Sequence, residues 1–135
     1  MADENNDDRL ELRIEQFANA LAALKLALAQ PEDEFVRDSI IKRFELSFET
    51  ARKAIRQWLV DQQEISFSAT KKEVMEAAFR TGLVGDPDVW NDLAAKRNDT
   101  SHEYDAGEAL AIVAFVRQKA VQPFEVLLAE LKNRS

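Results

Sequence analysis

The 135-residue sequence contains no cysteine, one histidine, three glycines and three prolines. The absence of cysteine excludes disulfides, zinc sites with cysteine ligands and thiol catalysis, and it fits a reducing compartment. The single histidine excludes a metal site built from several histidines, and no acidic cluster has clear ligand spacing. Glycine-rich phosphate loops are also missing. We therefore expect neither a metal nor another cofactor.

Neither a signal peptide nor a membrane span is expected. Its first nine residues are acidic and polar, which is the opposite of a secretory leader. The most apolar run, residues 21–29, is interrupted by Lys25 and is far too short to cross a bilayer. These features predict a cytoplasmic protein without a membrane partner.

Excess negative charge limits the partners of the chain. The formal net charge is −7 at pH 7. Since phosphate contacts supply most non-specific affinity for nucleic acids, an acidic chain is a poor general binder of them. Any binding of RNA must therefore depend on a local site.

Scarce glycine and proline favour long helices over a β architecture with many turns. We predict that residues 1–8 form a disordered acidic tail and that residues 9–135 form one helical domain. Apolar residues recur at helical spacing in the first helix, which ends at Gln30-Pro31, and in a second helix over residues 35–63. The predicted inward positions of the second helix are Ile40, Phe44, Phe48, Ala51, Ile55, Trp58 and Leu59.

Three further helices are indicated by their start signals. Thr70 with Glu73 forms a capping box, Asp86-Pro87 places a cap before a proline in the first turn, and Asp105 with Glu108 resembles another capping box. The last helix should be bent or split by Pro123. Its expected inward residues are Leu110, Val113, Val121, Phe124, Leu128 and Leu131. The sequence thus predicts an all-α, up-and-down bundle of four to five helices with short connections.

The candidate site is the segment from Arg97 to Tyr104, at the expected break between the last two helices. On a continuous helix, Arg97 and His102 would point about 140° apart. If the chain leaves helical geometry before Asp105, the two side chains can turn toward a common point. Across a two-fold dimer, two such segments can also face each other.

These residue types suit chemistry on RNA. Histidine can exchange a proton with a ribose 2′-hydroxyl near neutral pH, and arginine can hold the phosphate and stabilise its developing charge. Asn98 adds hydrogen bonds, and Tyr104 adds a stacking face and a hydroxyl that another enzyme can modify.

Structural roles are the alternative for the same residues. His102 can cap a helix, Arg97 can pair with an acid such as Asp99 or Glu103, and Tyr104 can lie at the rim of the core. The basic residues Arg52, Lys53 and Arg56 are interpreted as a solvated helix face rather than an RNA groove.

The pattern Arg97-x4-His102-x-Tyr104 resembles the signature of the HEPN superfamily in its HepT branch. Residues 42–49, 76–83 and 97–105 resemble the related nucleotidyltransferase substrate-binding proteins, and the likeness extends over residues 10–131. The resemblance implies a homodimeric helical bundle that binds a minimal nucleotidyltransferase.

If the protein is similar to the toxin–antitoxin members of this family, the resemblance implies that it is a metal-independent endoribonuclease. It also implies that the partner nucleotidyltransferase neutralises the protein by AMPylation. By position, Arg97 and His102 would be catalytic, Asn98 supporting, and Tyr104 the AMPylated residue. The alternatives are a non-catalytic subunit that binds substrate for the nucleotidyltransferase, and a plain helical interaction module.

Overall fold

The computed structural model describes residues 2–135, with side chains from Asp8 onward. The predicted disordered tail, residues 1–8, falls almost wholly outside the described side chains and stays a prediction. The helices are α1 (Ala2–Leu28), α2 (Glu34–Asp61), α3 (Lys71–Arg80), α4 (Pro87–Asp99), α5 (Ala106–Phe115), the π-helix η1 (Val116–Ala120) and α6 (Val121–Arg134). Residues 2–135 contain no strand, which confirms the predicted all-α class. None of the helices described is long and apolar enough to cross a membrane.

Local capping fixes where the later helices begin. The Thr70 hydroxyl accepts the backbone N–H of Glu73, and the Glu73 carboxylate accepts that of Thr70, so the predicted capping box is confirmed. Hydrogen bonding of the Glu73 carboxylate to the Thr70 backbone N–H, and then to the Thr70 side chain, lowers the pKa of Glu73. Asp86 caps α4 before Pro87, and Asp105 caps α5 by accepting the N–H of Glu108 at 2.8 Å. These starts place residues 100–105 in a short turn between α4 and α5.

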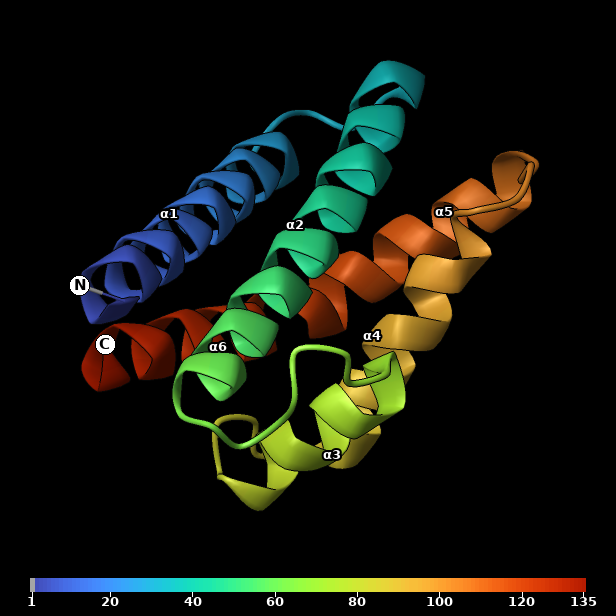
Figure 1. Cartoon of the computed structure of the whole chain (residues 1–135). Helices are drawn as coiled ribbons and strands as arrows, with labels where there is room; N and C mark the ends of the chain where they lie inside the picture. The colour runs from blue at the N-terminus through green and yellow to red at the C-terminus, as the bar shows by residue number, and fades with distance from the viewer. Residues whose placement is uncertain (1) are drawn as a thin grey trace.

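Helix α2 is the centre of the bundle. It contacts α1, α3, α4, α5 and α6. Figure 1 shows α1 and α2 side by side as an antiparallel hairpin, with α5, η1 and α6 forming one long segment that crosses them. The shorter helices α3 and α4 each contact α2 and lie on the side of it away from α1 (Figure 1). The α4–α5 turn extends away from the side where α1 begins and α6 ends (Figure 1).

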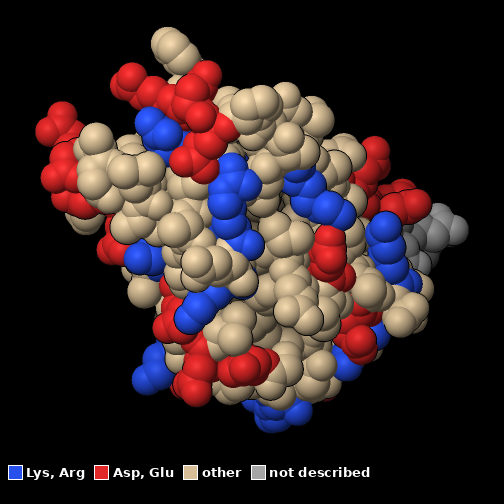
Figure 2. All heavy atoms as spheres, turned by 180° about the vertical axis from the view of Figure 1, so that it is seen from behind, with Lys and Arg blue, Asp and Glu red and all other residues tan. Residues whose placement is uncertain are grey.

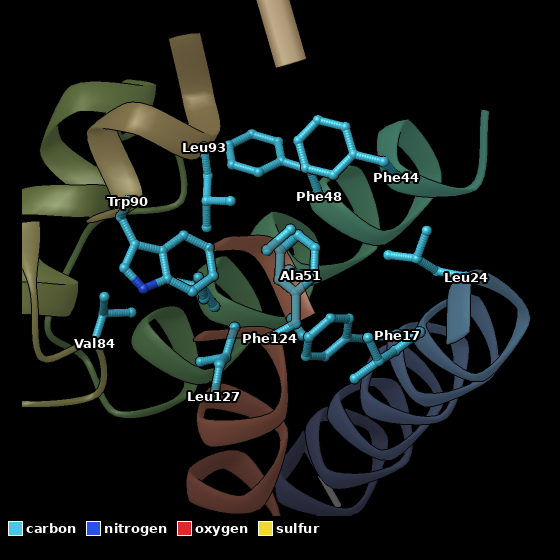
Figure 3. Close-up of a cluster of buried hydrophobic side chains, with 14 of the residues drawn as sticks. Phe17, Leu24, Phe44, Phe48, Ala51, Val84, Trp90, Leu93, Phe124 and Leu127 are labelled. Atoms are coloured by element: carbon cyan, nitrogen blue, oxygen red, sulfur yellow. The ribbon is translucent and has the colours of Figure 1, made fainter. Parts of the chain in front are cut away.

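Aromatic rings join the helices in the core (Figure 3). The ring of Phe124 lies 5.9 Å from that of Phe17 and 5.9 Å from that of Trp90, both in edge-to-face geometry. Phe48 lies 6.3 Å from Trp90. Such pairs add about 0.5–1.5 kcal/mol each beyond their buried area. Trp90 therefore ties α4 firmly to α2 and α6. The predicted inward residues of α2 are all buried.

Two expectations about the last helical segment had different outcomes. Pro123 was expected to bend or split the last helix, but residues 106–134 stay helical without a break. The change is one of helix type, because the π-helix η1 interrupts the α-helical geometry shortly before Pro123, which cannot donate a backbone hydrogen bond. The predicted inward position of Leu110 is wrong, because its side chain is 50% exposed. The buried stripe of this segment runs instead through Ala109, Ile112, Val113 and Val116, and Leu110 lies beside it.

Candidate functional site

A cleft of about 660 Å³ opens between α2, α3 and α4. Its walls combine apolar side chains with charged ones, and the motif residues Arg97 and Asn98 line it together with Ser101. The other lining residues are Phe48, Glu49, Arg52, Lys71, Lys72, Met75, Glu76, Phe79, Trp90, Asn91 and Ala94. We call this feature the α2–α3–α4 cleft. Part of the predicted site thus lies in a hollow with both aromatic and cationic groups.

The Arg97 side chain is held in place by three neighbours. Its Nε lies 3.3 Å from Oε1 of Glu49, and its Nη1 donates to the Ser101 hydroxyl at 3.0 Å and to the Thr100 hydroxyl at 3.4 Å. The Nε atom is buried, and its contact with Glu49 is an ion pair without the geometry of a hydrogen bond. The guanidinium is therefore fixed at one edge of the cleft.

No role is predicted for Glu49 from the sequence, although it lies in residues 42–49, one of the stretches on which the family resemblance rests. Arg97 does pair with an acid, as the structural alternative predicts, but the partner is Glu49 of α2 rather than Asp99 or Glu103. Asp99 pairs instead with Lys96 at 3.6 Å. The second oxygen of Glu49 lies 2.8 Å from the Arg52 guanidinium. One carboxylate thus lies between two guanidinium groups, and only the packing of α2 against α4 creates this arrangement.

Thr100 closes helix α4 and starts the turn. It is buried, and its hydroxyl donates to the Arg97 carbonyl oxygen at 2.6 Å. The same carbonyl oxygen also accepts the backbone N–H of Thr100 at 3.2 Å, so one residue satisfies a carbonyl at the helix end, where intrahelical partners are missing, with two donors. These two hydrogen bonds fix the point at which the chain departs from α4 toward His102.

His102 lies in the turn after α4, as the sequence predicted. Its side chain is exposed and does not line the cleft. Among residues 8–135, no hydrogen bond or ion pair of its imidazole is found, so the expected capping role has no support here. Within the described part of one chain, no hydrogen bond joins His102 to Arg97. The imidazole is left free to meet a ligand or a second protomer.

Tyr104 lies in a different setting. Its ring is half-buried against the core, and it lines a shallow hollow with Glu103, Asp105 and Glu108. Burial raises the pKa of the Tyr104 hydroxyl, and the negative charges of Asp38 and Glu45 raise it further. The phenol is therefore protonated near neutral pH. Seen from behind, acidic side chains gather at the end of the molecule that carries the α4–α5 turn (Figure 2).

Comparison with known proteins gives consistent matches. Residues 12–133 match the model of the family described as nucleotidyltransferase substrate binding protein like. A protein of Haemophilus influenzae named "Probable ribonuclease HepT" is 29% identical over 92 residues, which are 68% of this chain and 62% of the relative. The match thus spans less than two thirds of that relative's length.

A solved structure supports the fold. It is a Haemophilus influenzae protein described as having the fold of a substrate-binding domain of a nucleotidyltransferase, and it superposes with a TM-score of 0.67 at 24% identity. The superposition covers 96% of this chain and 98% of the other. The family match extends over nearly all of the helical bundle and includes the cleft and the α4–α5 turn. The chain belongs to the nucleotidyltransferase substrate-binding protein-like family.

Proposed function

We propose that this protein is a metal-independent endoribonuclease that acts as a homodimer and is the partner of a minimal nucleotidyltransferase. Arg97 and His102 are the catalytic residues, and Asn98 supports them. The observation that carries the proposal is the position of the motif. A fixed guanidinium lines the cleft, and an exposed imidazole without a described partner follows in the next turn.

The reaction follows from these two groups. His102 takes the proton of a ribose 2′-hydroxyl, whose oxygen then attacks the adjacent phosphorus. The bond from phosphorus to the 5′ oxygen breaks, which leaves a 2′,3′-cyclic phosphate and a 5′-hydroxyl that takes up a proton. The Arg97 guanidinium stabilises the negative charge that builds on the phosphate oxygens. Because Arg97 lines the cleft and His102 does not, the dimer is proposed to complete the site with two motifs.

Tyr104 is the proposed point of control. Its hydroxyl oxygen attacks the α-phosphorus of ATP in the active site of the nucleotidyltransferase, pyrophosphate leaves, and AMP stays attached to the ring. Because the phenol is protonated near neutral pH, the transfer needs a base, which the partner would supply. The adduct adds bulk and negative charge two residues from His102, and it blocks RNA by sterics and repulsion.

The ribonuclease proposal is tested by RNA cleavage in the presence of EDTA. The wild-type protein should cleave, whereas Arg97→Ala and His102→Ala should each lose about 100-fold or more in rate. Arg80→Ala is the matched control, because its exposed guanidinium pairs with Glu64 and does not line the cleft. Equal cleavage by all four proteins, or none by the wild type, would contradict the proposal.

A non-catalytic, substrate-binding subunit of the nucleotidyltransferase is the second candidate. It is favoured by the engagement of Arg97 with Glu49 and by the position of His102 outside the cleft. This function predicts stable co-purification with the nucleotidyltransferase and no RNA cleavage by the wild type. A plain helical module, the third possibility, predicts that His102→Ala changes stability alone.

A further inference from the structure

The α2–α3–α4 cleft is lined by positively charged side chains beyond the one arginine of the motif. Its lining includes four basic side chains, from Arg52, Lys71, Lys72 and Arg97, but only two carboxylates. One carboxylate, that of Glu49, is already paired with two of the guanidinium groups. The exposed lysines at the start of α3 therefore face the cleft without a described ion pair. In a chain with a net charge of −7, this local excess favours an anionic ligand.

The same cleft offers apolar surface beside these cations. Phe79 and Met75 from α3 are half-buried and line it, while Phe48 and Trp90 form nearly buried walls. A partly exposed phenyl ring is a stacking surface that accepts any nucleobase. The volume of about 660 Å³ lies within the range of roughly 300–1,000 Å³ typical of pockets for small organic ligands.

We propose that the α2–α3–α4 cleft is a nucleotide subsite, which holds one ribonucleotide of a single-stranded RNA next to the phosphate that is cleaved. The base stacks on Phe79, and Lys71 and Lys72 neutralise the backbone phosphates on the side away from the motif. The inference rests on the proposed ribonuclease function. Asn98 and Ser101 connect the two sites, because both line the cleft at the end of α4.

Single-stranded RNA fits this geometry better than other anions. A cleft walled by three helices admits an unpaired base, whereas a duplex keeps its bases stacked and out of reach. Inorganic phosphate would use the lysines but not the aromatic wall. The acidic α4–α5 turn repels phosphates on the other side of the motif, so the strand is guided toward the lysines.

Binding of a labelled, single-stranded hexaribonucleotide, measured by fluorescence anisotropy, tests the subsite. The protein carries His102→Ala so that the probe stays intact. In this background, Phe79→Ala should weaken binding about tenfold. The matched control is Phe67→Ala, which removes a phenyl ring that is 79% exposed and lies outside the cleft.

The charged half of the subsite has its own variant. Lys71→Ala/Lys72→Ala should weaken binding about tenfold and reduce the slope of log K against log salt by about 0.7 for each lysine removed. Lys53→Ala/Lys119→Ala removes the same charge from two exposed lysines outside the cleft and should have little effect. This pair also keeps the test valid if Phe79→Ala fails to fold.

Three results would overturn the subsite. Binding that is equally affected by cleft and control variants would place the RNA elsewhere. Competition by AMP or by inorganic phosphate at the affinity of the hexanucleotide would identify a site for free nucleotides or for phosphate alone. If Lys71→Ala/Lys72→Ala cleaves RNA with an unchanged KM, the subsite proposal is contradicted and the ribonuclease proposal is not. Conversely, absence of cleavage by the wild type would overturn that function without altering the binding result.

Discussion

The α2–α3–α4 cleft and the α4–α5 turn are neighbours with opposite character. The cleft is lined by four basic and two acidic side chains and by aromatic rings. The shallow hollow at the turn is lined by Tyr104 and three carboxylates, those of Glu103, Asp105 and Glu108. The motif lies across the border between them, since Arg97 lines the cleft and His102 follows in the turn.

This difference indicates separate tasks for the two regions. Under the proposed function, an RNA phosphate would be attracted to the cleft and repelled by the turn, so a strand would be held on one side of His102 only. The turn instead holds a protonated tyrosine hydroxyl in an acidic setting, and this hydroxyl is the proposed point of modification. Binding is thus expected to depend on the cleft, and control on the turn.

The largest expected difference between the two regions concerns stability. Trp90→Ala should lower the free energy of unfolding by about 3–5 kcal/mol, because its indole packs on Phe48 and Phe124 beneath the cleft. His102→Ala, in the exposed turn, should change it by no more than about 0.5 kcal/mol. Urea denaturation measures both. If the two variants lose similar amounts of unfolding free energy, the turn contributes to the stability of the core as much as the floor of the cleft does, which would contradict this difference.

The next effect concerns the position of Arg97. Glu49→Gln should lower kcat for RNA about tenfold with little change in KM, since the guanidinium loses its ionic partner at 3.3 Å. Glu130→Gln is the control, because it removes an equivalent carboxylate that pairs with Arg134 at 2.7 Å outside the cleft. An unchanged or increased kcat in Glu49→Gln would mean that the ion pair does not position Arg97 for catalysis.

A smaller effect is expected where the cleft meets the turn. Thr100→Val should destabilise the protein by about 1 kcal/mol, because a buried hydroxyl that bonds the Arg97 carbonyl at 2.6 Å is lost. Thr50→Val removes a hydroxyl that bonds the Leu46 carbonyl in mid-helix, and about half that loss is expected. Thermal denaturation of both variants compares them. Equal losses would contradict a special role for Thr100 at the end of α4.

The smallest effect is on the titration of Tyr104, which is the only tyrosine. Its phenolate absorbance should appear at higher pH in the folded protein than in urea, because burial and then Asp38 and Glu45 raise its pKa. The folded state holds this proton more tightly, so the associated stability is present below the ordinary tyrosine pKa and is lost as pH rises through the folded value.

Charge-neutral variants test the cause of that shift. Asp38→Asn/Glu45→Gln should move the midpoint back toward the ordinary value, but not fully, since burial is the largest cause. Glu15→Gln/Asp92→Asn removes two exposed carboxylates elsewhere and should leave the midpoint unchanged. If both double variants shift it equally, net charge rather than the local setting is responsible.

The helices were predictable because their signals are local. The caps at Thr70, Asp86 and Asp105 depend on residues within one turn, and the structure has them where the sequence indicated. The face of Leu110 was predicted wrongly because its neighbour Ala109, a small residue, takes the inward position. An alanine gives a weak apolar signal in a periodicity analysis.

The candidate site was predictable only in part. The location of His102 and Tyr104 in a turn between two helices followed from the caps. The pairing of Arg97 with Glu49 did not, because it joins two helices and depends on their packing. For the same reason Arg52, interpreted from the sequence as part of a solvated face, was not expected to line the cleft. Long-range contacts of this kind have no local signal.

The central claim is that cleavage by Arg97 and His102 is switched off at Tyr104. Its most direct test combines intact mass and RNA cleavage on the same sample, after incubation with ATP and the proposed partner, a minimal nucleotidyltransferase. The account predicts that the wild type gains the mass of one or more AMP units and stops cleaving, whereas Tyr104→Phe gains none and continues to cleave. AMP on Tyr104 with undiminished cleavage, or loss of cleavage in Tyr104→Phe under the same conditions, would contradict it.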